Sequence, residues 1–147
     1  MLAAVIGMFL LSADGVSLAR EAMERSEPIT STVLAKGSPV DAPGKMLQLE
    51  RYTLAEGASM PEQSRPGAFV VYVQQGLFAF AVVEGEAAVT KAGSPRSDII
   101  EAGTEVIAYP GDEIFINGGV VHTARNAGST TVVVLTAALT TGENPGF

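Results

Sequence analysis

Short runs of strand-forming residues, separated by residues that favour turns, fill positions 46–138 and constrain the fold more than any other feature. Gly, Pro, Asn or Asp stands at almost every junction between these runs, which is the pattern of an antiparallel sandwich or barrel. Helical periodicity appears only before Glu27. The sequence therefore predicts an all-β fold. We expect strands at residues 46–54, 68–75, 77–83, 87–91, 105–109, 113–116, 120–125 and 130–138.

Two of the junctions predict particular turns. In the segment 109–112 (YPGD), Pro and Gly occupy the two central positions, which suits a type II turn. The segment 117–119 (NGG) lies between two strand runs, and its residues tolerate positive φ, so it predicts a hairpin. The segment 61–66 begins and ends with Pro and is expected to be a loop.

Length, charge and residue usage exclude several function classes. The 147 residues suffice for one domain, and the net charge of −7 argues against a nucleic-acid partner. Because the chain has no Cys, it can form no disulfide, thiol nucleophile, iron–sulfur cluster or Cys-type zinc site. His122 is the only His, so one chain cannot build a metal centre from two or three His side chains.

The first residues form an uninterrupted apolar run at positions 2–11 (LAAVIGMFLL). Ten residues are too few to span a bilayer, so we expect no membrane span. The run suits the apolar region of a secretory signal, and the segment 17–19 (SLA) offers small residues for cleavage, although no Lys or Arg precedes the run. Residues 1–19 are therefore interpreted as a signal segment of a secreted or periplasmic protein. The alternative is an ordinary helix in a cytoplasmic protein.

Residues 20–45 are rich in Pro and Gly and predict an extended N-terminal arm before the barrel. Within the arm, residues 29–34 favour a strand but have no obvious partner nearby in the sequence. Pairing with an edge strand of another subunit would satisfy their backbone groups, which predicts a two-fold homodimer, although a loose tail would suit the same residues. Residues 46–140 are the predicted barrel, and residues 141–147 are a C-terminal tail.

A spaced set of residues in the second half of the chain resembles the second motif of the cupin superfamily. Gly111, Gly119, His122 and Asn126 match that motif in register, and Asn117 stands where the family has a proline. The resemblance covers about residues 46–138. It implies a single-domain, double-stranded β-helix barrel, jelly-roll-like in topology and often dimeric.

The first cupin motif is recognisable only by its frame. Gly57 and Gly76 flank it, but Gln63, Arg65 and Phe69 stand where the family places two His and a Glu. The family uses these three positions and the second-motif His to hold a divalent metal. An amide oxygen is a weak ligand, a guanidinium has no lone pair to give, and a phenyl ring offers nothing. The sequence therefore predicts no metal site and implies no other cofactor.

The same positions predict a ligand site of a different kind. Gln63 and Arg65 are two residues apart, so in an extended segment they project to the same side, toward His122 if the cupin register holds. A guanidinium presents a planar fork that fits a carboxylate or phosphate. We therefore expect Gln63, Arg65 and His122 to bind a small polar or anionic molecule in the barrel mouth. Phe69 and Tyr72 are expected to line this pocket.

Other interpretations of these residues remain open. On its strand His122 shares a face with Val120 and Ala124, where a buried imidazole is more often a satisfied core residue than a reactive one. Arg65 could form an ion pair with Glu62 or extend into solvent.

Two other functions fit the same sequence. The chain could be a structural or interaction module whose barrel is filled by side chains. It could instead be a cupin enzyme, for instance an isomerase or epimerase with His122 as base, which would need a carboxylate or a Tyr within reach. The chain has three such tyrosines, namely Tyr52, Tyr72 and Tyr109. No residue is assigned a catalytic role.

Overall fold

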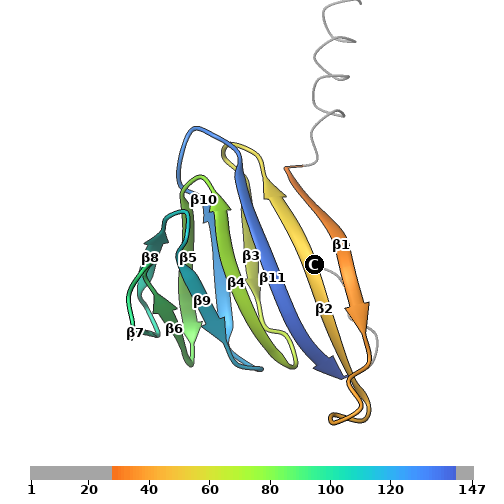
Figure 1. The fold of residues 1–147 in the computed structure, drawn as a ribbon. Helices are drawn as coiled ribbons and strands as arrows, with labels where there is room; N and C mark the ends of the chain where they lie inside the picture. Colours follow the sequence, from red (N-terminus) through yellow and green to blue (C-terminus); the bar gives the residue numbers. More distant parts are fainter. Residues whose placement is uncertain (1–27, 142–147) are drawn as a thin grey trace, which may run out of the picture.

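The structure is a computed structural model that describes residues 28–141 (Figure 1). These residues form eleven strands and no helix, which confirms the all-β prediction. The strands are β1 (Ile29–Gly37), β2 (Lys45–Leu54), β3 (Ser59–Gln63), β4 (Ala68–Gln75), β5 (Phe78–Glu84), β6 (Glu86–Thr90), β7 (Ser97–Glu101), β8 (Glu105–Ala108), β9 (Glu113–Ile116), β10 (Val121–Asn126) and β11 (Val132–Thr141). The described residues include no helix that could cross a membrane.

The strands form two facing antiparallel sheets. The large sheet has seven strands in the order β1-β2-β11-β4-β9-β6-β7, and the small sheet has four in the order β3-β10-β5-β8. In Figure 1 the large sheet lies in front of the small one. Side chains alternate along each strand, so Phe69, Val71 and Val73 of β4 are buried between the sheets, whereas Val70 and Tyr72 face outward. The core is therefore the space between the two sheets.

The ends of each predicted strand lie within three residues of the ends of an observed strand. Two observed strands, β3 and β7, were not predicted. β3 contains Pro61, which cannot donate a ladder hydrogen bond and so favours a loop in the sequence. This strand is at the edge of the small sheet, where a proline is tolerated. β7 is an edge strand of the large sheet and carries the charged residues Asp98 and Glu101. Edge strands have one neighbour, so the sequence pattern that marks them is weak.

The strand-forming part of the N-terminal arm pairs within its own chain. β1 lies antiparallel to β2, from Ile29 opposite Leu54 to Gly37 opposite Leu47. The expectation that this stretch lacks a neighbouring partner is therefore wrong, because residues 38–44 turn the chain back onto itself. The dimer stays a prediction, but the unpaired arm no longer supports it. Residues 1–19, interpreted above as a signal segment, lie outside the described residues, as do residues 142–147 of the predicted tail. Thr141, the first residue of that tail, belongs to β11.

Two glycines of the second motif occupy turns that require them. Gly111 has φ of 93°, and the Asp112 amide donates to the Tyr109 carbonyl at 2.9 Å, so the predicted type II turn is present. Gly119 has φ of 85° and also ends a turn. The predicted hairpin at residues 117–119 is wrong, however, because β9 belongs to the large sheet and β10 to the small one. This turn carries the chain between the sheets.

The Asn126 side chain of the second motif forms hydrogen bonds with two backbone segments, the end of β2 and the loop before β11. Its side-chain nitrogen lies 3.1 Å from the carbonyl oxygens of Leu54 and Ala55 and 2.8 Å from that of Thr130. Its side-chain oxygen accepts a hydrogen bond from the Gly128 amide at 2.9 Å. Asn126 and Leu54 are buried, so water cannot readily replace the bond between them, whereas Ala55 and Gly128 are half-buried and Thr130 is exposed. Asn126 thereby holds the end of β2 against the start of β11.

We expect the substitution Asn126→Ala to lower the free energy of unfolding by about 1–3 kcal/mol, because it leaves the buried Leu54 carbonyl and the half-buried Ala55 and Gly128 backbone groups without this partner. Urea unfolding monitored by circular dichroism measures the change. The control Asn117→Ala removes an exposed amide and should change stability by less than about 0.5 kcal/mol. Equal effects of the two substitutions would contradict this role of Asn126.

Candidate functional site

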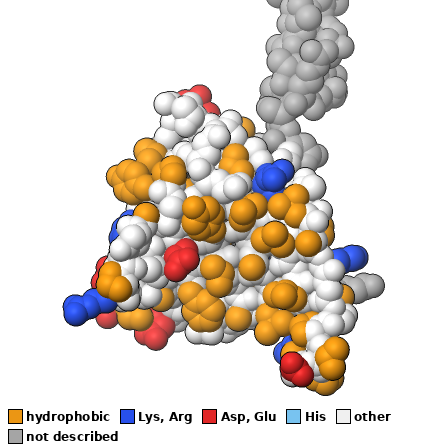
Figure 2. Space-filling view, viewed as in Figure 1, with side chains coloured by type: hydrophobic (Ala, Val, Ile, Leu, Met, Phe, Trp, Pro, Cys, Tyr) orange, Lys and Arg blue, Asp and Glu red, His pale blue; other side chains and the backbone are white. Residues whose placement is uncertain are grey.

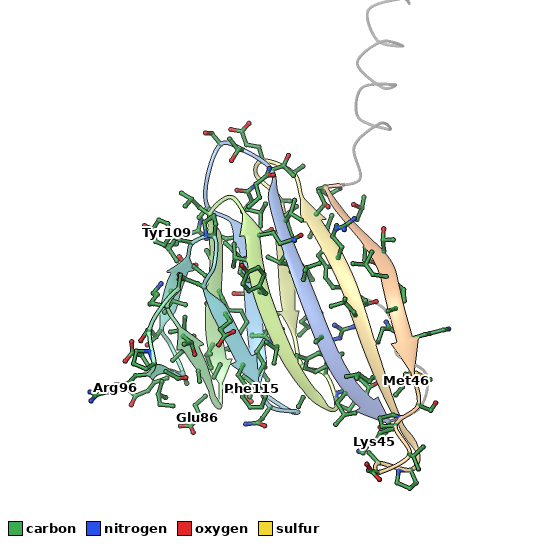
Figure 3. The ribbon with its side chains drawn as sticks, in the orientation of Figure 1. Lys45, Met46, Glu86, Arg96, Tyr109 and Phe115 are labelled. Atoms are coloured by element: carbon green, nitrogen blue, oxygen red, sulfur yellow. The ribbon has the colours of Figure 1, made fainter. Side chains whose placement is uncertain are left out.

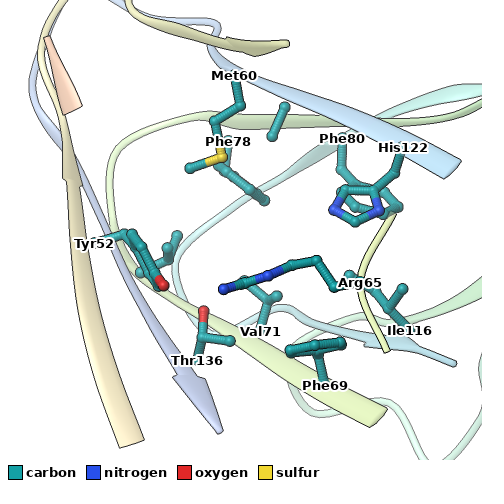
Figure 4. Close-up of a pocket in the computed structure, with 12 residues that line it drawn as sticks. Tyr52, Met60, Arg65, Phe69, Val71, Phe78, Phe80, Ile116, His122 and Thr136 are labelled. Carbon is teal, nitrogen blue, oxygen red and sulfur yellow. The ribbon is translucent and has the colours of Figure 1, made fainter. Parts of the chain in front are cut away.

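A small cavity lies between the two sheets at the centre of the fold (Figure 4). Its volume is about 30 Å³, roughly the share of one molecule in liquid water. Aromatic and aliphatic side chains make most of its wall, and its polar groups come from Tyr52, Arg65, His122 and Thr136. The barrel interior is therefore nearly filled by its own side chains.

Arg65 follows β3, and its side chain enters the barrel rather than extending into solvent (Figure 4). The guanidinium carbon lies 5.2 Å from the centre of the Phe69 ring, close enough for a cation–π interaction. On its other side the guanidinium donates a hydrogen bond to the Tyr52 hydroxyl. A loop residue therefore places a permanent positive charge in a cavity whose wall is mostly apolar.

Tyr52 and Glu50 connect this cation to a buried carboxylate. The two residues are two positions apart on β2, so both face inward, and both are buried. The Tyr52 hydroxyl donates to Glu50 Oε2 at 2.5 Å. Burial, followed by this bond to Glu50, raises the pKa of Tyr52, so the phenol stays protonated at physiological pH. The interior thus contains a linked series of cation, phenol and carboxylate, which lowers the cost of burying each charge.

His122 is a buried, neutral imidazole. It is 5% exposed, and its ring is stacked with that of Phe80 at a centroid separation of 5.3 Å. Burial lowers the pKa of His122, the hydrogen bond to the Val120 carbonyl opposes this effect, and the nearby Arg65 charge lowers the pKa further. Nδ1 lies 3.1 Å from the Val120 oxygen, so the neutral ring carries its proton there and Nε2 is an acceptor.

The structure brings together only some of the residues that the sequence singled out. Arg65, His122 and Phe69 line the inner cavity. Gln63 lies across from His122 in the β3–β10 ladder, but its amide donates to the Met60 sulfur at 3.8 Å, and it lines a groove outside. Arg65 and Gln63 therefore do not meet in one pocket.

Tyr72 does not line the cavity, contrary to expectation. It is 43% exposed and lies on the outer face of the large sheet. Phe69 and Tyr72 are three residues apart on one continuous strand, so their side chains project to opposite faces. The two could not both have faced the barrel interior.

The groove is much larger than the inner cavity. Its volume is about 590 Å³, and it is open to solvent. β1 and β2 supply Ile29, Thr30, Ser31 and Tyr52, and the β3 region supplies Met60, Pro61 and Gln63. Tyr52 and Met60 line both spaces, so they form the wall between the groove and Arg65. The hydroxyls of Thr30 and Ser31 were not predicted, because only the pairing of β1 with β2 brings them here.

The residues at the metal-binding positions of the cupin motifs do not fit a metal ion. The Gln63 amide faces a sulfur atom, Arg65 directs a cation inward, and Phe69 has no donor atom. His122 alone keeps a free ring nitrogen, and such centres rest on three or four protein ligands. Within residues 28–141, no three His, Asp or Glu side chains lie close enough together to hold a metal.

No protein-family model matches the sequence, and no curated protein matches it in sequence. The fold, in contrast, is similar to several solved structures. A cupin superfamily protein from Desulfitobacterium hafniense superposes with a TM-score of 0.51 and 17% identity, covering 79% of this chain and 81% of that chain. KdgF from Halomonas sp. gives 0.54 and 15%, covering 82% and 84%.

A salicylate 1,2-dioxygenase from Pseudoaminobacter salicylatoxidans also superposes, with a TM-score of 0.54 and 14% identity. The match covers 84% of this chain but only 30% of that enzyme. At such low identity these similarities establish the fold and leave the activity open. The two facing sheets, the turns of the second motif and these superpositions lead to one conclusion. The chain has the cupin fold.

Proposed function

We propose that this chain is a metal-independent cupin-fold protein that binds a small polar molecule bearing a carboxylate or a similar acceptor group. The observation that carries the proposal is the Arg65 side chain, which enters the barrel and directs its guanidinium toward Tyr52. The ligand occupies the groove beside this residue. Its acceptor group faces Arg65.

The groove has the size and chemistry of a ligand site. A volume of about 590 Å³ falls within the range of small-molecule pockets, which is about 300–1,000 Å³. Thr30, Ser31 and Gln63 supply hydroxyl and amide groups for hydrogen bonds, and Ile29 supplies apolar contact. None of the residues that line the groove is charged. Arg65 lies behind the wall that Tyr52 and Met60 form. It is therefore the charged donor that a molecule bound in the groove could reach.

Contact between the ligand and Arg65 requires one side chain to move. The inner cavity holds about one water molecule, so Tyr52 and Met60 shield the guanidinium from the groove. Tyr52 is held by its bond to Glu50. Met60 is unbranched and has three rotatable bonds, which makes it the adaptable part of this wall.

Charge selects against cations at this position. A divalent cation beside Arg65 would meet repulsion that is screened only weakly away from water. An acceptor group gains a charge-assisted hydrogen bond, worth about 1.5–3 kcal/mol. Glu50 balances part of the Arg65 charge. The proposed site therefore needs only one acceptor group of the ligand, and no additional cation, to satisfy the guanidinium.

A second candidate is a structural module with a filled barrel. The cavity of about 30 Å³ favours it, because the interior has almost no free volume. An enzyme with His122 as base has less support. Nε2 of His122 is free to accept a proton, but the cavity beside it holds only about one water molecule, and the Tyr52 proton is committed to Glu50.

Succinate and its neutral analogue succinamide separate these candidates. We expect the protein to bind succinate more tightly, with a shift of the Arg65 Nε–H resonance in an NMR titration. Arg65→Ala should weaken succinate binding by about 10- to 150-fold, the loss of one charge-assisted hydrogen bond, and Arg65→Lys should recover part of it. The control Arg96→Ala removes an exposed guanidinium remote from the groove (Figure 3) and should leave binding unchanged.

Equal affinity for the two probes, or unchanged binding in Arg65→Ala, would contradict the role of Arg65. Absence of any shift in the groove resonances with either probe would favour the filled barrel. Circular dichroism of each variant ensures that lost binding does not reflect lost folding.

The neutral state of His122 predicts how stability depends on pH. Its pKa is lowered in the folded protein, so between that value and about 6.5 the unfolded chain binds more protons. We expect the free energy of unfolding to be steady above pH 7 and to fall as the pH is lowered through 6.5 toward 5. The substitution His122→Asn keeps a donor for the Val120 carbonyl and should remove this slope. Asp112 also has a lowered pKa, but it loses its contribution only below about pH 4.

Urea unfolding at half-unit pH intervals measures both curves. Parallel curves for the two proteins, or stability that rises as the pH falls, would contradict a neutral buried His122.

A further inference from the structure

Four strands lie at the edges of the two sheets, and three of them carry features that discourage pairing with another chain. β3, β7 and β8 have only four or five residues each, and they contain Pro61, Asp98 and Glu105 respectively. β1, at the end of the large sheet in Figure 1, is different. It has nine residues, and its first five carry neither a charge nor a proline. Such an edge is a template on which an extended chain can pair.

One hydrogen bond shows which backbone groups of β1 face the open edge. The Ala55 amide donates to the Pro28 carbonyl at 2.8 Å, so the Pro28 carbonyl faces β2. Backbone groups of successive strand residues point alternately to the two sides of the strand. Those of Thr30 therefore face β2, whereas the N–H and C=O groups of Ile29 and Ser31 face the edge. In the described part of the chain β1 has β2 as its one neighbour, so these groups are open to a further strand.

The open edge of β1 borders the ligand groove. Ile29, Thr30 and Ser31 all line the groove. Their side chains alternate between the two faces of the sheet, so a space that touches all three follows the edge of the strand. On the opposite side the consecutive residues Met60 and Pro61 of the edge strand β3 line the groove. The groove is therefore a channel between two strand edges, a shape that suits an extended chain.

Building on the proposed function, we infer that the groove binds a short extended peptide, which adds to β1 as an antiparallel strand. The main chain of the peptide forms hydrogen bonds with the N–H and C=O groups of Ile29 and Ser31. In this mode of recognition the main chain supplies affinity, and alternate side chains supply specificity.

The register of β1 on β2 indicates which peptide residue carries the carboxylate. Ser31 lies opposite Tyr52, whose hydroxyl accepts a hydrogen bond from Arg65. The peptide residue opposite Ser31 belongs to the same row, so its side chain points to the inner face of the sheet. An acidic side chain at this position extends toward Arg65, with Met60 between them as the adaptable part of the wall. Charge complementarity therefore selects Asp or Glu opposite Ser31.

The peptide residues on either side of the acidic one point to the outer face of the large sheet. There they lie beside the exposed Thr30 and Thr32. Figure 2 shows this outer face, with hydrophobic side chains gathered over the middle of the sheet. Valine suits both flanking positions, because β-branched residues favour an extended chain.

The probe acetyl-Thr-Val-Glu-Val-Thr-amide tests the inference by calorimetric titration of the full chain. We expect it to bind at least about 10-fold more tightly than succinate, because main-chain hydrogen bonds add to the charge-assisted one. The same probe with Gln in place of Glu should bind about 10-fold more weakly. Hydrogen exchange of the Ile29 and Ser31 amides should slow when the probe binds, whereas the Thr30 amide, which already faces β2, should change little.

Two N-methylated forms of the probe test strand addition on the unaltered protein. A methyl group on the Glu nitrogen removes the donor to the Ser31 carbonyl and should weaken binding at least about 10-fold. A methyl group on the next nitrogen, which faces away from β1, is the matched control and should change affinity by less than about threefold. In the protein, Ser31→Pro removes an N–H that faces the edge, where proline is tolerated, and should weaken the Glu probe about 10-fold. Circular dichroism verifies that this variant folds.

A Glu probe that binds no more tightly than succinate, or equal effects of the two methyl groups, would overturn the inference. Succinate binding that depends on Arg65 would in that case still support the proposed function. Equal affinity of the Glu and Gln probes, with the difference between the methyl groups intact, would support strand addition and contradict the role of Arg65. Probe binding that weakens as the protein concentration rises from about 5 to 100 µM would assign the edge to a second copy of the chain and overturn the inference.

Discussion

Entry of the half-buried Arg65 guanidinium into a largely apolar barrel is the constraint on which the interior of this protein depends. A charge away from water is tolerated only when other groups compensate for it. Arg65 meets this requirement with the Phe69 ring, the Tyr52 hydroxyl and, through that hydroxyl, the Glu50 carboxylate. The same charge helps to keep His122 neutral. The centre of the barrel is therefore a chain of coupled residues rather than a set of independent ligands.

The second cupin-like motif is matched in this chain and the first is matched only in its glycines, because the two motifs have different physical roles. Gly111 and Gly119 supply positive φ at turns, and Asn126 forms hydrogen bonds with backbone groups of two segments. These tasks belong to the fold and remain whatever the barrel holds. The positions that the resemblance assigns to metal binding belong to the chemistry of the site, and there this chain has a cation, Arg65, and an aromatic ring, Phe69, in place of donor atoms.

The sequence predicts the fold well because alternation and turn residues report directly on strands in the middle of a sheet. Edge strands such as β3, with its proline, carry a weaker signal. Within the site, the inward orientation of Arg65 agrees with prediction, whereas Gln63 turned toward Met60. Phe69 and Tyr72 are three residues apart on one strand, so the sequence itself indicates that their side chains project to opposite faces of the sheet. The groove was beyond prediction, because it exists only once β1 has paired with β2 and lies beside β3.

The central claim is that Arg65 replaces a bound metal as the cation of the barrel. A crystal structure of the full chain grown with an excess of Mn²⁺, with anomalous diffraction data, tests this claim most directly. The account predicts clear density for the Arg65 guanidinium between Phe69 and Tyr52, and no anomalous peak near His122. A peak about 2.1 Å from Nε2 of His122, with Arg65 turned out into solvent, would contradict it.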